Sequence, residues 1–170
     1  MAMAQGGRRP RQPLYDAQQR ARRDATAWTL VQGVLAPLQF LVFLGSLALV
    51  LHTLATGEGA WAANASIVAK TGLLYAIMVT GSIWEKVVFG RYLFAPAFYW
   101  EDMVSMLVLA LHSTYLMALV TGWLDTGGLM LLALAAYASY AVNATQFLLK
   151  LRAARLETAP ALHLDAEGAR

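Results

Sequence analysis

Four long apolar stretches constrain this chain more than any other feature of its sequence. They cover residues 28–55, 66–90, 101–122 and 128–151 and are separated by short polar or aromatic segments. Each stretch is as long as the roughly 20 residues that a helix needs to cross a bilayer. Backbone polar groups in lipid must be paired within the segment, which favours helices. The sequence therefore predicts an all-α polytopic membrane protein, a bundle of four transmembrane helices.

Basic residues flank these stretches and predict the orientation of the chain. Segment 1–27 reads as a basic cytoplasmic N-terminal tail, 28–151 as the membrane domain, and 152–170 as a cytoplasmic C-terminal tail. With the N-terminus inside, twelve of the thirteen Lys and Arg residues lie on the cytoplasmic side, as cytoplasmic flanks prefer. Lys70 is the exception, and we expect it near the outer face with its amine reaching the interface. Both termini are therefore predicted to be cytoplasmic.

Composition and motifs exclude several classes of function. The chain has no cysteine, so disulfide and metal–thiolate chemistry have no ligands. The net charge of +3 is explained by the membrane flanks, so we expect lipid and no nucleic acid as a partner. Phosphate loops, zinc motifs and nucleophile elbows are missing from the sequence. His52 and His112 differ in expected depth by about 20 Å at the rise of a helix, which argues against bis-histidine haem ligation.

Polar residues recur at helical spacing within each apolar stretch. The four sets are Gln32, Gln39, Ser46 and Thr53; Tyr75, Ser82 and Glu85; Glu101, Ser105, His112 and Tyr115; and Ser139, Asn143, Gln146 and Lys150. Polar side chains at membrane depth face other helices or a cavity, because lipid cannot satisfy them. The simplest interpretation is hydrogen bonding between helices, and the alternative is a functional site inside the bundle.

Acidic residues gather where the second and third stretches meet the predicted inner interface. Glu85, Glu101 and Asp102 flank the connection RYLFAPAFYW at residues 91–100, together with Lys86 and Arg91. Charged helix ends beside an aromatic belt are one interpretation of this group. The other is a site for a flat, anionic, hydrophobic ligand that stacks on aromatic rings with its carboxylate near a cation.

The chain resembles the 3-vinyl bacteriochlorophyllide hydratases of bacteriochlorophyll biosynthesis over about residues 14–156. The resemblance rests on the strings WTLVQGVLAPLQFLVFL, YAIMVTGSIWEKVVFG, YLFAPAFYWEDMVSM, LALH and AAYASYAVNATQFLLKLRAARL. It implies a hydro-lyase that adds water to the C3 vinyl group of chlorophyllide or bacteriochlorophyllide in a bacterial inner membrane. The substrate carries its own magnesium, so no further cofactor and no protein metal site are expected. Association with other pigment-biosynthesis enzymes is a further expectation.

Hydration of a vinyl group requires an acid, a stabilised cation and a base, and the sequence offers candidates for each. Glu101 or Glu85 is expected to be the acid, since a carboxyl shielded from water tends to stay protonated. Asp102 is expected to stabilise the cation, and His112 to act as base or to face the magnesium. The expected pigment contacts are Lys86 and Arg91 for the propionate and Tyr92, Phe98, Tyr99, Trp100 and Tyr115 for the rings.

The same residues also fit a protein that holds the pigment without converting it. A membrane tetrapyrrole carrier or assembly factor would need the same aromatic surface and the same cations. Turnover of the vinyl pigment separates the two classes. A small transporter is a third class, but its typical pair of broken helices is missing from the hydropathy pattern.

Overall fold

The computed structural model describes residues 13–167, with side chains from 13 to 155. Its elements are α1 (Ala17–Ala25), α2 (Ala27–Thr56), α3 (Ala60–Phe89), α4 (Tyr99–Thr121) and α5 (Thr126–Glu167). Four helices, with α5 counted as far as Arg155, are long and apolar enough to cross a membrane. This confirms the predicted all-α fold with four spans, and the chain is a multi-pass membrane protein. Part of the predicted N-terminal tail, with Arg8, Arg9 and Arg11, lies outside the described residues, as does Arg170.

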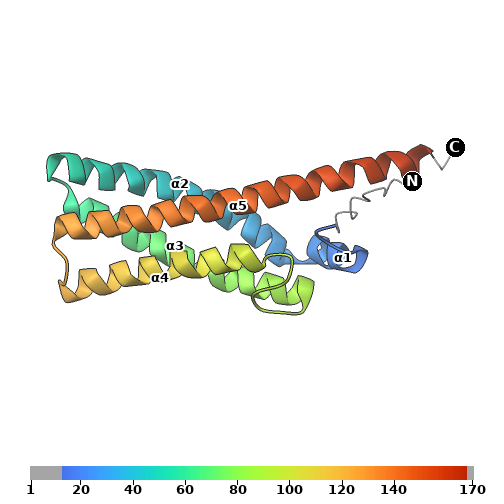
Figure 1. Cartoon of the computed structure of the whole chain (residues 1–170), viewed down its shortest axis with the longest axis horizontal. Coiled ribbons are helices and arrows are strands. Elements are labelled where there is room, and N and C mark those ends of the chain that lie inside the picture. Colours follow the sequence, from blue (N-terminus) through green and yellow to red (C-terminus); the bar gives the residue numbers. More distant parts are fainter. Residues whose placement is uncertain (1–12, 168–170) are drawn as a thin grey trace, which may run out of the picture.

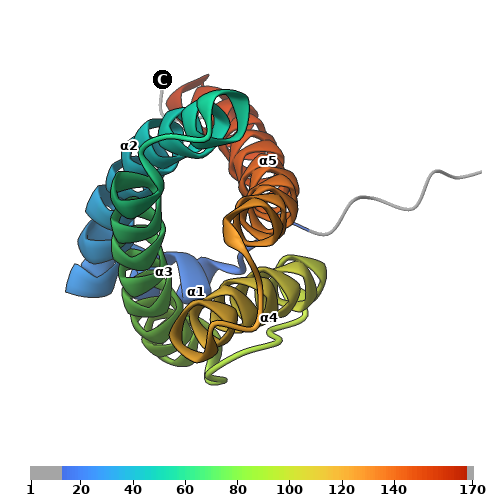
Figure 2. The same ribbon diagram turned by 90° about the vertical axis from the view of Figure 1, so that its left-hand side faces the viewer.

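The four long helices form an up-and-down bundle (Figure 1). Seen along the bundle, α2, α3, α4 and α5 follow one another around a shared interior (Figure 2). The most extensive packing joins α2 to α3 and α4 to α5, and α5 closes the ring against α2. The segment at residues 90–98 connects α3 to α4 at one end, called here the loop end. The short α2–α3 and α4–α5 turns lie at the opposite end.

Two helices extend beyond the stretches that hydropathy marks. The sequence predicts a start at residue 66 for the second span. In the structure α3 begins at Ala60, because the connection from α2 is confined to residues 57–59. Gly57 and Gly59 have left-handed backbones, with φ of 75° and 78°, which glycine adopts without a steric penalty. At the other end of the chain, α5 continues past the predicted limit at residue 151. Residues 151–157 read LRAARLE, a run of strong helix formers without glycine or proline.

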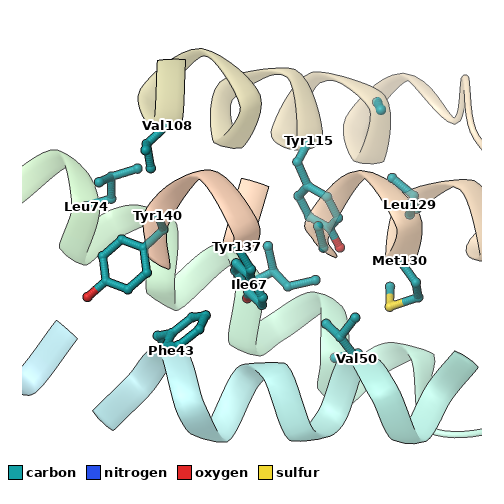
Figure 3. Close-up of a cluster of buried hydrophobic side chains, with 13 residues drawn as sticks. Phe43, Val50, Ile67, Leu74, Val108, Tyr115, Leu129, Met130, Tyr137 and Tyr140 are labelled. Carbon is teal, nitrogen blue, oxygen red and sulfur yellow. The ribbon is translucent and has the colours of Figure 1, made fainter. Parts of the chain in front are cut away.

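The interior is lined by one face of each helix. On α2 the buried residues are Gln39, Phe43, Ser46, Val50 and Thr53, whose spacing of three or four residues marks a single face. Three members of the predicted polar set on this span are therefore buried. The apolar side chains that converge from the four helices are drawn in Figure 3 and include Val50, Ile67, Leu74, Val108 and Tyr115.

Lys70 does not lie where the sequence places it. Its side chain is fully buried in the bundle, with 0% of its surface exposed, and its Nζ lies 3.6 Å from the centre of the Tyr140 ring. The expectation of an amine that reaches the outer interface is therefore wrong. The helical phase explains the difference, because Lys70 lies on the same face of α3 as the buried Ile67 and Leu74.

Helix α1 packs against the loop end of α3. Asp16 and Gln19 form a reciprocal cap at its start, which satisfies backbone donors that would otherwise lack partners. Tyr15, just before the helix, stacks on Phe89 with ring centres 5.8 Å apart, and the Arg23 guanidinium lies 4.8 Å from the centre of the Tyr15 ring. Burial raises the pKa of Tyr15, so the phenol stays neutral. The loop end is therefore covered on one side.

Candidate active site

Two carboxyl groups hold the connection between α3 and α4 in place. Asp102 Oδ2 accepts a hydrogen bond from the backbone N–H of Phe94 at 2.7 Å, and Glu85 Oε2 accepts one from the N–H of Ala95 at 3.2 Å. Glu85 is the last buried polar residue of α3, and Asp102 lies in the first turn of α4. The two helix ends thus direct acidic side chains toward the same short loop. Side-chain acceptors here satisfy backbone groups that would otherwise be buried without partners.

The carboxyl groups of Glu85 and Asp102 also lie close enough to each other to form a hydrogen bond when one of them is protonated. Their side chains are almost fully buried, with 5% and 3% of the surface exposed. Two carboxyl groups in contact repel when both are ionised, and a hydrogen bond between them requires a proton on one. The pair therefore combines an acid and a base within one contact. We call it the carboxyl pair.

Glu101 has a different environment from its neighbour Asp102. Its Oε2 lies 2.5 Å from Lys150 Nζ, and the same amine donates a hydrogen bond to the backbone carbonyl of Ala97. Lys150 also lies 4.9 Å from the centre of the Phe98 ring. Glu101 is thus engaged in an ion pair with Lys150, which favours the carboxyl pair over Glu101 as the source of the proton.

The connection itself contains one residue with an unusual backbone. Phe94 has φ of 58°, a left-handed conformation that is uncommon for bulky residues and costs about 1–3 kcal/mol. The hydrogen bond from its N–H to Asp102 and the contact of its ring with Tyr99, 5.8 Å between centres, hold this conformation. The carboxyl pair therefore stabilises the strained backbone of the connection between α3 and α4.

The predicted aromatic residues divide into a buried and an exposed set. Phe98 is 2% exposed, and its ring lies 5.8 Å from Phe89 and from Phe147 and 5.7 Å from Trp84. Tyr92, Tyr99 and Trp100 are 61%, 44% and 71% exposed. The exposed rings surround the loop rather than line an enclosed pocket. These three rings are therefore accessible from outside the bundle.

Two cations accompany the exposed rings. Lys86 Nζ donates to the backbone carbonyl of Gly90 at 3.0 Å and lies 5.3 Å from the centre of the Tyr92 ring. Arg91 is exposed. Among the side chains that the structure describes, neither Lys86 nor Arg91 forms an ion pair. Both cations are therefore available to an anionic ligand at the loop end.

His112 and Tyr115 lie away from the carboxyl pair. His112 is ten residues beyond Asp102 on α4, about 15 Å along the helix, and Tyr115 is about 20 Å away at the same rise. Tyr115 donates to Asn64 Oδ1 at 2.7 Å in the opposite half of the bundle. The structure thus gathers Glu85, Glu101 and Asp102 but places these two residues elsewhere.

Lys150 was missed as a site residue by the sequence-based prediction. A signal was present, because Lys150 continues the polar set of the fourth span after Asn143 and Gln146. Sequence alone did not show that this set ends beside Glu101, since the crossing of α4 and α5 fixes that contact. A charged residue on the inward face of a span is by default a candidate for a pairing or functional role.

Comparison with known proteins gives consistent matches over most of the chain. The family model described as 2-vinyl bacteriochlorophyllide hydratase matches residues 15–153. A 2-vinyl bacteriochlorophyllide hydratase from Cereibacter sphaeroides is 68% identical over 149 residues, 87% of this chain and 92% of the relative. One from Rhodobacter capsulatus is 64% identical over 149 residues, 88% of this chain and 86% of the relative. No solved structure matches the chain significantly.

Proposed function

The chain belongs to the 2-vinyl bacteriochlorophyllide hydratase family, and we propose that it adds water to the vinyl group of a bacteriochlorophyllide or chlorophyllide. The product carries a 1-hydroxyethyl group in place of the vinyl group. The "2-vinyl" of the family name and the "3-vinyl" of the resemblance denote the same substituent. The structural observation that carries the chemical part of the proposal is the buried carboxyl pair at the loop end.

The carboxyl pair supplies the acid and the base that vinyl hydration requires. Glu85 donates its proton to the terminal vinyl carbon, where the π electrons form the new C–H bond. The positive charge on the adjacent carbon spreads into the conjugated macrocycle and is favoured by the nearby Asp102 carboxylate. Water attacks this carbon, forms the C–O bond and gives up a proton to Asp102. Transfer of that proton from Asp102 to the neighbouring Glu85 carboxylate restores the starting state.

Pigment binding in this proposal uses the exposed part of the loop end. A propionate pairs with Lys86 or Arg91, which are free of ion pairs among the described side chains. Tyr92, Tyr99 and Trp100 offer ring faces for a flat macrocycle, with offset or edge-on contacts favoured. The strained loop at Phe94 then has to move to bring the vinyl group to the carboxyl pair. His112 and Tyr115 have no direct role in this arrangement.

The remaining assignments follow from the topology and from the substrate. We propose that both termini lie in the cytoplasm of a bacterium and that the chain lies in its cytoplasmic or intracytoplasmic membrane. The magnesium belongs to the substrate, and the protein supplies no cofactor of its own. Water and the pigment are the reactants, lipid surrounds the spans, and other pigment-biosynthesis enzymes are candidate neighbours that would pass on a membrane-bound substrate.

A turnover experiment tests the function against the carrier alternative. Purified protein in lipid nanodiscs is incubated with a large excess of vinyl pigment in water enriched in ¹⁸O. We expect many hydroxyethyl products per protein molecule, each with one ¹⁸O in the new hydroxyl group. Binding of the pigment without product in excess of the protein would instead support a carrier or assembly factor.

The predicted orientation has its own test, because the chain contains no cysteine. Trp123 at the opposite end is 68% exposed and Tyr92 at the loop end is 61% exposed, so Trp123→Cys and Tyr92→Cys each add one accessible thiol. A membrane-impermeant maleimide on cells with an opened outer membrane should label Trp123→Cys. It should label Tyr92→Cys only after lysis. The reverse pattern would contradict the cytoplasmic placement of the termini.

A further inference from the structure

Lys70 is a buried cation that the proposed reaction does not use. It is the eleventh of the 30 residues of α3 and has 0% exposure, and its Nζ contacts the face of the Tyr140 ring. Among the described residues Nζ has no hydrogen-bond partner. An amine at this depth is costly in a membrane protein unless other polar groups or water satisfy it.

His112 on α4 presents a complementary atom close by. Its Nδ1 lies 2.8 Å from the backbone carbonyl of Val108, and because a carbonyl accepts, Nδ1 carries the proton. Nε2 therefore has a free lone pair, yet it is buried and has no hydrogen-bond partner among the described residues. Lys70 is near enough to act electrostatically on this ring. The His112 ring lies 5.9 Å from the Tyr137 ring between centres, and Tyr137 is one turn from Tyr140 on α5. Because Lys70 Nζ contacts Tyr140, Lys70 Nζ and the His112 imidazole lie at neighbouring depths in the bundle.

Further unpartnered atoms lie between this position and the carboxyl pair. Asn143 Nδ2 donates to Ser105 Oγ at 2.8 Å, while Asn143 Oδ1 has no partner within the described part of the chain. Gln146 Oε1, one turn nearer the loop end, is also buried and unpartnered by any side chain or backbone group that the structure describes. Ser105 lies one turn from Asp102 on α4, where side chains three residues apart are neighbours. Polar atoms thus follow one another at intervals of one to two turns, roughly 5–10 Å.

We propose that these atoms bind a file of internal water, with one water between Lys70 Nζ and His112 Nε2, and that the file supplies the reacting water to Asp102. A water needs two to four polar partners, and a donor facing an acceptor meets that need in an otherwise apolar core. We call this the water file, formed by Lys70, His112, Asn143, Ser105 and Gln146. Its use as a supply rests on the proposed hydratase function, whereas the presence of the water does not.

The supply is needed because of where the pigment binds. A macrocycle that lies over the loop end displaces solvent from the exposed surface around the buried carboxyl pair, as closure of an active site does. The water that attacks the vinyl carbon then has to reach Asp102 from the bundle interior. Asn143 and Ser105 are the polar side chains that connect this interior to the first turn of α4.

Radiolytic hydroxyl-radical footprinting in nanodiscs tests the water file without substrate. Radicals form from bound water and modify neighbouring side chains, so Tyr140 and His112 should be oxidised although both are buried. Met130 is an internal control, because it is fully buried among apolar groups and should stay unmodified despite its reactive sulfur. Protection of Tyr140 and His112 equal to that of Met130 would overturn the proposal.

Two substitutions then connect the water to turnover. Lys70→Met and Asn143→Leu replace polar groups by apolar side chains of similar size and should abolish oxidation of His112. Each should lower kcat about tenfold, as expected when one hydrogen bond of about 1.4 kcal/mol is lost, with little change in the KM for the pigment. Lys70→Met should also leave Tm unchanged or raise it, because an unpaired buried cation is removed.

The control lies next to Lys70 on the same helix. Thr71 is fully buried, but its hydroxyl donates to the backbone carbonyl of Ile67 at 2.8 Å, so Thr71→Val should change neither oxidation nor kcat. A Lys70→Met protein with a lower Tm and unchanged kcat would show a structural lysine and refute the supply. If wild-type protein shows the oxidation but forms no product, the water file stands and the hydratase function fails.

Discussion

Glu85→Gln is expected to lower kcat for vinyl hydration by about 10²- to 10⁴-fold, the usual loss when a general acid is removed. The amide cannot donate a carboxyl proton, but its oxygen can still accept from the Ala95 N–H that Glu85 binds at 3.2 Å. The loop therefore keeps its anchor and only the proton is lost. The measurement is the disappearance of the vinyl-pigment absorption at saturating substrate, together with a pigment-binding titration.

Binding and a matched acid provide the controls for this variant. The Kd for the pigment should stay within about threefold, since an interaction made in the transition state leaves ground-state binding unchanged. Glu58→Gln removes an exposed carboxyl at the opposite end of the bundle and should have no effect on kcat. A Glu85→Gln protein with the wild-type rate would remove Glu85 from the mechanism.

Lys150→Met is expected to have the largest effect on stability. It leaves Glu101, with 9% of its side chain exposed, as a buried carboxylate without its cation, and it frees the carbonyl of Ala97. Removing one partner of a buried ion pair typically costs about 3–5 kcal/mol. We therefore expect a clearly lower Tm in detergent by a thermal-shift measurement. We also expect the loop at Ala97 and the first turn of α4 at Glu101 to lose the contact that Lys150 makes with both.

A double-mutant cycle separates the ion pair from general damage. Glu101→Gln combined with Lys150→Met removes both charges and should recover much of the Tm lost in Lys150→Met, because no unpaired charge remains. Simple addition of the two single effects would show that the two side chains stabilise the bundle independently. In that case the contact of Lys150 with Glu101 would not account for the geometry of the loop end.

The number of spans followed from the sequence because hydropathy depends on local composition. Helix length and apolar content suffice to mark a membrane span, and the structure contains four such helices. The inward phase of Gln39, Ser46 and Thr53 was also predictable, because a seven-residue spacing places them on one face. The limits of the helices were less predictable, since turn geometry at Gly57 and Gly59 depends on backbone conformation that hydropathy does not report.

The site was predictable in part because several of its residues are close together in the sequence. Glu85, Glu101 and Asp102 meet because they flank one short connection, which the sequence shows directly. Which carboxyl pairs with which group depends on the packing of α5, and this brings Lys150 to Glu101. The burial of Lys70 likewise depends on the rotation of α3 within the bundle. Contacts between helices distant in sequence are the part that local patterns do not determine.

The most direct test of the account measures the single-turnover rate of vinyl hydration, with protein in excess over the pigment. The rate is compared among Glu85→Gln, Asp102→Asn and the double variant. Two groups that exchange one proton act as a unit, so their effects on the single-turnover rate should not multiply. The account predicts that each single variant slows hydration by at least about 10²-fold and that the double variant is no slower than the slower single variant. Multiplying effects, or a wild-type rate in either single variant, would contradict the shared-proton mechanism.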